Sequence, residues 1–149
     1  MFTYPSLWSR VAICKSIGFL LTGGCVLLLP GLFAGLSWQT QLGFVLWYTT
    51  LGAFVGLFGV LNYHPMLQLA LPWWFRGPWL GGWMNLILAL FIWDQLAGFQ
   101  AGFFGPGSAL ASPWWFVVEG IVLGAFMDWT ATRFGGEGPA CVGTPAAAT

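Results

Sequence analysis

The stretch Ser16–Ala34 reads SIGFLLTGGCVLLLPGLFA and contains no charged side chain. A helix needs about 20 consecutive apolar residues to cross a hydrocarbon core roughly 30 Å thick. This stretch therefore predicts a membrane-spanning helix, and the rest of the chain has to be interpreted with lipid as its solvent.

Three further stretches have a similar length and apolar character. They run about Leu42–Leu61, Pro78–Ala97 and Pro113–Thr132. Their apolar residues are continuous, whereas strands of a membrane β-barrel alternate apolar and polar residues over about 10 residues. The sequence predicts an all-α integral membrane protein, a four-helix bundle with short loops that forms a single domain over residues 1–133. The tail 134–149 is rich in Gly, Ala and Pro, and we expect it to be disordered and cytosolic.

The composition excludes several classes of protein. Of the 149 residues, 58% are hydrophobic and only 5% are charged, with a formal net charge of zero. Soluble domains carry about 25% charged residues. Four scattered Lys and Arg side chains cannot form the basic patch of a nucleic-acid-binding protein. The expected partners are the lipid bilayer and, within it, other membrane proteins or further copies of the chain.

The positions of the cations predict the orientation. Arg10 and Lys15 precede the first span, Arg76 lies between the second and third, and Arg133 follows the fourth. Four spans put these regions on one side of the membrane, and cytosolic loops carry the excess of Lys and Arg. We therefore expect both termini in the cytosol.

Glycines recur four residues apart within or beside the spans, as in the pairs Gly31/Gly35, Gly52/Gly56 and Gly120/Gly124. Glycine lets helix backbones approach closely in lipid. The pattern fits either oligomerisation or packing within one chain. Because several spans carry it, packing within the chain is the favoured interpretation.

Two acidic residues are candidates for binding a proton or an ion. Glu119 lies about six residues into the Pro113–Thr132 span, and Asp94 lies near the end of the Pro78–Ala97 span. Ionisable groups at membrane depth usually have a partner or a function. Asp94 could approach Glu119 from the neighbouring span, or it could simply reach the outer headgroups.

Asp128 is expected to be structural. It lies near the inner end of the last span, where Lys15 or Arg76 could pair with it. Glu119 and Asp128 are nine residues apart, which places them on opposite faces of a helix. The two carboxyls therefore cannot form one local site.

The linker Asn62–Gly77 is predicted to lie in the inner interface as a short helix or a re-entrant segment. Asn62, Tyr63 and His64 at its start form an interfacial polar cap. His64 is the only histidine, so paired haem ligation is excluded, and no Cys, Asp or Glu cluster accompanies it as a zinc site would require. No metal or other cofactor is predicted.

The stretch Gly56–Phe91, GLFGVLNYHPMLQLALPWWFRGPWLGGWMNLILALF, resembles the COPI-associated small four-span membrane proteins. In that family an apolar linker leads to an Arg-Gly pair that opens the third helix, as Arg76-Gly77 does in this sequence. The resemblance implies a non-enzymatic membrane protein with a trafficking or structural role.

No hydrolase, metalloprotease or P-loop motif is present, so the sequence indicates no enzyme. The leading hypothesis is a non-catalytic accessory or scaffold component that packs glycine-lined and aromatic faces against partner membrane proteins. One alternative is a small proton- or cation-coupled transporter that uses Glu119. Another is a lipid or hydrophobic-ligand binding protein with a groove beside the Asn62–Gly77 linker.

Overall fold

The computed structural model describes residues 6–33, 35–64, 66 and 68–143. They are mostly helical, so the all-α expectation is confirmed. The elements in chain order are α1 (Leu7–Leu28), α2 (Pro30–Phe33), α3 (Trp38–Phe58), β1 (Tyr63–His64), β2 (Leu69–Ala70), α4 (Trp73–Phe91), α5 (Trp93–Phe104), α6 (Trp114–Gly135) and the 3-10 turn η1 (Pro139–Val142).

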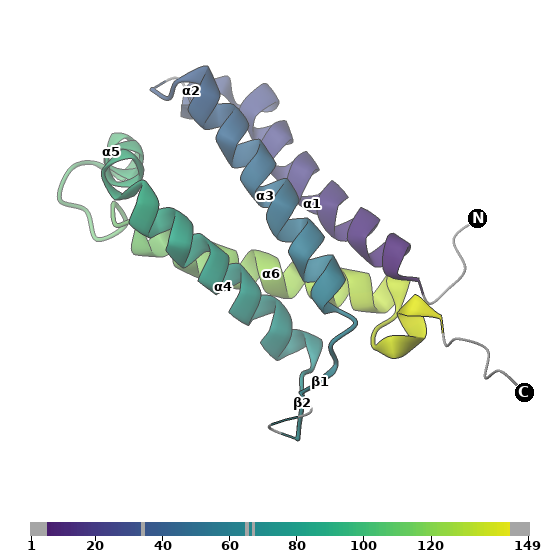
Figure 1. Ribbon diagram of the computed structural model, residues 1–149. Helices are drawn as coiled ribbons and strands as arrows, with labels where there is room; N and C mark the ends of the chain where they lie inside the picture. Colours follow the sequence, from purple (N-terminus) through teal and green to yellow (C-terminus); the bar gives the residue numbers. More distant parts are fainter. Residues whose placement is uncertain (1–5, 34, 65, 67, 144–149) are drawn as a thin grey trace, which may run out of the picture.

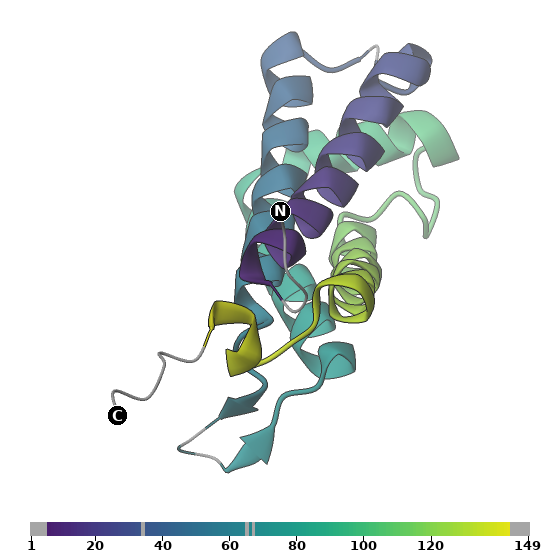
Figure 2. The ribbon, with the colours of Figure 1, turned by 90° about the vertical axis from the view of Figure 1, so that its right-hand side faces the viewer.

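Two helix pairs make up the fold. α1 packs along α3, and α4 packs along α6 (Figures 1 and 2). Each half of the chain has the same order of a long helix, a shorter helix and a long helix. The tetrapeptide Leu-Gly-Ala-Phe occurs in both second long helices, at Leu51–Phe54 in α3 and at Leu123–Phe126 in α6. In both helices the glycine of this tetrapeptide packs against the backbone of the partner helix. Gly52 lies against α1, and Gly124 lies against α4.

Glycines bring the backbones of each pair into contact. A Cβ atom on Gly81 would overlap the carbonyl oxygen of Gly120, and one on Gly124 would overlap that of Gly77. Within the other pair, a Cβ on Gly52 would overlap the carbonyl oxygen of Cys14. The pairs Gly52/Gly56 and Gly120/Gly124 thus serve packing within the chain. In contrast, Gly31 and Gly35 have open space around their Cα atoms.

By length and hydropathy, two helices of the described residues could cross a membrane, namely α1 and α3. A third candidate appears if α4 and α5 count as one broken span. α6 is as long as α1, at 22 residues, but it carries Glu119, Asp128 and Arg133 and is not among these candidates. Composition therefore supports membrane association without establishing the four spans expected from the sequence.

The first predicted span has the wrong boundaries. α1 begins at Leu7 rather than Ser16, and it ends at Leu28 rather than Ala34. The early start includes Arg10, whose side chain is fully buried and paired, so the charge does not mark the edge of the helix. The early end precedes Pro30, which has no N–H to continue the helix and instead begins α2.

The third predicted span is also corrected. α4 begins at Trp73 and encloses Pro78, and the helix breaks at Ile92. α5 then continues at an angle of 96° to α4, so the predicted Pro78–Ala97 helix is two helices (Figure 1). The other two spans differ less: α3 is shifted by a few residues from Leu42–Leu61, and α6 nearly coincides with Pro113–Thr132.

The linker and the tail differ from expectation as well. In place of the expected short helix, the described part of the linker contains a two-stranded antiparallel ribbon, in which Tyr63 pairs with Ala70 and His64 with Leu69. The end of the linker, from Trp73, already belongs to α4. The part of the tail that the structure describes, up to Gly143, holds the end of α6 and η1, with Cys141 buried. Disorder from residue 134 is therefore wrong for this part, and residues 144–149 lie outside the described residues.

Candidate functional site

A buried amide lies where three of the long helices meet. Asn85 of α4 is fully buried, and its Nδ2 donates to the hydroxyl of Tyr48 at 3.1 Å and to the carbonyl of Phe116 at 2.8 Å. The indole Nε1 of Trp47 donates to Asn85 Oδ1 at 3.1 Å. Polar side chains join helices in this way where water is absent. Asn85 therefore ties α3, α4 and α6 together at the centre of the fold.

Glu119 lies one turn beyond Phe116 on α6, next to this polar centre. Its side chain interacts with that of Tyr48, yet the residue is exposed at the side of the bundle. It takes part in none of the ion pairs found among the described residues. Glu119 is thus a carboxyl without a cationic partner in the described part of the chain.

A first cavity of about 270 Å³ opens beside Glu119. α1 contributes Thr22 and Cys25 to its lining, and α3 contributes Phe44 and Tyr48. Apart from these side chains and Glu119, the walls are formed by Leu21, Leu123, Phe33, Phe99 and Phe116. The cavity therefore gives a mostly apolar setting to the carboxyl.

A second cavity of about 380 Å³ reaches Glu119 from the side of α5. Its other polar residue is Gln100, which is only 6% exposed and whose Oε1 has no hydrogen-bond partner among the described residues. The remaining lining consists of Phe99, Phe103, Phe104, Leu110, Trp115 and Phe116. Sequence reasoning missed Gln100, although an amide within the aromatic run FQAGFF (Phe99–Phe104) was a visible signal.

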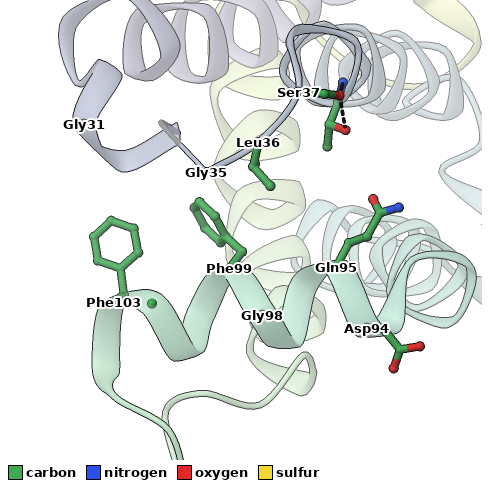
Figure 3. Close-up of a pocket in the computed structure, with 11 residues that line it drawn as sticks. Gly31, Gly35, Leu36, Ser37, Asp94, Gln95, Gly98, Phe99 and Phe103 are labelled. Carbon is green, nitrogen blue, oxygen red and sulfur yellow. Dashed lines mark hydrogen bonds between the residues drawn. The ribbon is translucent and has the colours of Figure 1, made fainter.

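Asp94 lies elsewhere. It is in the first turn of α5 and lines a different cavity, of about 700 Å³, between α5 and the segment that leads into α3. Figure 3 shows Gln95 and Phe99 pointing toward Leu36 and Ser37, while the carboxyl of Asp94 points away from them. The structure does not bring Asp94 and Glu119 into one cavity, so they do not form the two-carboxyl site that the sequence allowed.

Asp128 pairs with two arginines. Arg76 Nε donates to Asp128 Oδ2 at 2.8 Å and Arg76 Nη2 to Oδ1 at 3.0 Å, and Arg10 Nη2 reaches Oδ1 at 2.5 Å. The side chain of Asp128 is fully buried, and Arg76 is 4% exposed. Lys15, the other expected partner, is in none of the ion pairs in the described part of the chain. Arg76 also reaches Glu137 of the tail at 3.4 Å.

Arg10 is the member of this cluster that sequence reasoning missed. Besides Asp128, its guanidinium donates to the carbonyls of Gly56 and Gly136 and to Thr132 Oγ1. A Cβ atom at Gly59 or Gly135 would overlap the Arg10 side chain. The cluster therefore joins the start of α1, the start of α4 and the ends of α3 and α6. Its satisfied hydrogen bonds indicate a structural role.

The expected polar cap lies at the same end of the molecule. The backbone carbonyl of Asn62 accepts from the N–H of Leu71 at 2.8 Å, and Tyr63 and His64 form β1. The hydrogen bond between Asn62 and Leu71 thus lies next to the Tyr63–Ala70 pair and extends the ribbon. In the described ranges, no group of three or more His, Cys, Asp or Glu side chains could hold a metal ion.

Comparison with known protein families, with curated proteins and with solved structures finds no match to this chain. The described residues form a helical protein with two or three helices of membrane-like composition. The resemblance of Gly56–Phe91 to the COPI-associated proteins stays a prediction.

Proposed function

We propose that the chain is a non-catalytic, four-span membrane protein that acts as an accessory or scaffold component by packing against partner membrane proteins. The observation that carries this proposal is a ladder of aromatic rings on the outer face of α4. Phe75, Trp79 and Trp83 follow one another four residues apart, with ring centroids 6.1 and 6.3 Å apart and planes within 14° and 8° of parallel. All three side chains are exposed.

The ladder borders a groove of about 500 Å³ between α4 and α6, to which Pro78, Gly82 and Ile121 also contribute. Exposed apolar surface alone does not call for a partner in a bilayer, because lipid tails are as apolar as leucine. Helices associate in lipid through close packing. A groove with stacked, mutually supporting rings offers a fixed shape into which a partner helix can pack.

The proposed membrane arrangement uses α1, α3, α4 and α6 as spans. Their lengths of 19 to 22 residues correspond to about 29–33 Å of helix. That length matches a hydrocarbon core of roughly 30 Å. α5, bent away from α4, would lie along the surface at the outer end. Arg10, Arg76 and Arg133 would then all lie at the cytosolic end, together with both termini.

Photo-crosslinking in native membranes tests the scaffold role. A photoreactive phenylalanine replaces Trp83 in the groove or, as a control, Leu46, which is 57% exposed on α3. We expect discrete protein adducts from position 83 and none from position 46. A strictly monomeric particle in mild detergent, with the same adduct pattern at both positions, would contradict the proposal.

A second candidate function is proton- or cation-coupled transport by Glu119. The observation that favours it is that Glu119 lines cavities on two sides, one toward α1 and one toward α5. In proteoliposomes, Glu119→Gln should abolish a pH-gradient-driven flux, and the control Asp94→Asn should retain it. An unchanged flux in Glu119→Gln would remove this candidate.

A further inference from the structure

The cavity between α5 and α6 has an unusual balance of polar groups. Its polar side chains are the amide of Gln100 and the carboxyl of Glu119, and none of the described residues lining it is basic. Among the described residues, the buried Oε1 of Gln100 has no hydrogen-bond donor and the carboxylate of Glu119 has no cationic partner. A ligand for this cavity therefore has to supply hydrogen-bond donors.

Aromatic rings line the same cavity as these two acceptors. The ring of Phe99 lies 5.4 Å from that of Phe103 and 6.5 Å from that of Phe116, centroid to centroid. The indole of Trp115 donates to the carbonyl of Ala109 at 3.1 Å, which fastens the loop between α5 and α6 over α6. The faces of aromatic rings carry partial negative charge and attract cations. The aromatic walls and the two acceptors thus both favour a cationic ligand that donates hydrogen bonds.

We propose that this cavity binds the ammonium group of an amphiphile. An N–H donor of the ammonium would satisfy Gln100 Oε1, and its positive charge would pair with Glu119, in the shorter and stronger type of hydrogen bond that ionised groups form. The volume of about 380 Å³ is in the range of small-molecule sites. An anion is disfavoured, because it would meet a carboxylate and an amide oxygen.

The rim of the cavity indicates where the rest of the ligand goes. Phe103, Phe104, Leu110 and Trp115 are each about half exposed. These side chains would cover an alkyl chain that extends from the ammonium into lipid. The ammonium could belong to a free alkylamine or to the headgroup of phosphatidylethanolamine, since both present N–H donors on a positive nitrogen.

This site is separate from the α4 groove and does not depend on the scaffold role. The test uses the full chain, delipidated in a maltoside detergent, with native mass spectrometry of bound ligand. The free-amine arm compares dodecylammonium with dodecanol and dodecanoate, which have the same chain but a neutral or negative head. The lipid arm compares short-chain phosphatidylethanolamine with phosphatidylglycerol.

The chain offers matched control variants on α5. Glu119→Gln and Gln100→Met remove the two acceptors, and Asp94→Asn and Gln95→Met make the same chemical changes at the different cavity of α5. Thermal unfolding by circular dichroism shows whether each variant is folded. Should Glu119→Gln fail to fold, Gln100→Met and the comparison of head groups on the unmodified chain decide the result.

We expect dodecylammonium to bind about tenfold more tightly than dodecanol, with dodecanoate weakest. Glu119→Gln and Gln100→Met should lose most of this preference, whereas the controls keep it. Binding of phosphatidylethanolamine with the same variant pattern would support the lipid headgroup as the source. Equal binding of dodecylammonium and dodecanol, or variants of Glu119 and Gln100 that behave like their controls, would overturn the proposal.

Discussion

Two carboxyl groups on α6, nine residues apart, have opposite surroundings. Asp128 is fully buried and bound by the guanidinium groups of Arg10 and Arg76. Glu119 is exposed at the side of the bundle, beside two largely aromatic cavities whose described lining residues include no cation. An acidic residue in an apolar helix therefore does not by itself indicate either a structural or a binding role. Its role depends on whether other helices bring cations to it.

The largest effect on stability is expected from a change in the buried cluster of Arg10, Arg76 and Asp128. Asp128→Asn leaves two buried guanidinium groups without their counter-charge, and breaking a buried ion pair by removing one partner costs about 3–5 kcal/mol. The free energy of unfolding, measured by denaturant titration in mixed micelles, should fall by that amount. Glu137→Gln is the control, because Glu137 is 39% exposed and lies 3.4 Å from Arg76. It should cost at most about 1 kcal/mol. Equal effects of the two changes would break the comparison.

The glycine contacts should give the next largest effect. Gly81→Ala places a Cβ atom against the Gly120 backbone, and over-packing of this kind costs about 1–3 kcal/mol. Gly24→Ala, at a helical position with open space, should instead stabilise by up to about 1 kcal/mol because alanine is the better helix former. Opposite signs of the two changes in unfolding free energy check this prediction. A neutral Gly81→Ala would show that α4 and α6 lie farther apart than described.

The central amide should matter less. Asn85→Leu removes the interhelical hydrogen bonds to Trp47, Tyr48 and Phe116, and such bonds average about 0.6 kcal/mol in membrane proteins. We expect a loss of roughly 1–2 kcal/mol in unfolding free energy. Thr49→Val is the control, since the hydroxyl of Thr49 donates to the carbonyl of Val45 within its own helix. A control that loses as much as Asn85→Leu would argue against a joining role for Asn85.

The smallest effect on stability is expected at Glu119. Glu119→Gln removes a carboxyl that makes no ion pair in the described part of the chain, so unfolding free energy should stay within about 0.5 kcal/mol of the original. The same micelle titration measures it beside Asp128→Asn. A loss comparable to that of Asp128→Asn would mean that Glu119 is structural too, and the contrast between the two carboxyls would disappear.

Much of the fold could be predicted because hydrophobic length and glycine spacing are local signals. They indicated helices close to α3 and α6, as well as the glycine contacts within the chain. Arg10 was missed because a charge was taken to mark the end of a span. That inference fails when a carboxylate from another helix neutralises the charge.

The break at Ile92 and the ribbon at Tyr63–Ala70 could not be predicted in the same way. The sequence around Ile92, LFIWDQL (Leu90–Leu96), contains neither Gly nor Pro, so no local breaker marks the end of α4. Gln100 and Glu119 line one cavity only because α5 turns at that break. Their pairing depends on tertiary packing, which neither residue's neighbours in sequence reveal.

The proposal that four helices cross the bilayer can be tested most directly by the accessibility of three positions outside the long helices. Met66→Cys in the ribbon, Ser108→Cys between α5 and α6, and Val142→Cys after α6, each in a chain with Cys14, Cys25 and Cys141 replaced, are labelled in intact cells with a membrane-impermeant maleimide. Four spans predict labelling of Ser108→Cys from outside, and of Met66→Cys and Val142→Cys only after the cells are opened. Labelling of Ser108→Cys from the same side as Met66→Cys would contradict the proposal, since that is the result of two spans, α1 and α3, alone, and labelling of Val142→Cys from outside would contradict it too, since that is the result of three spans.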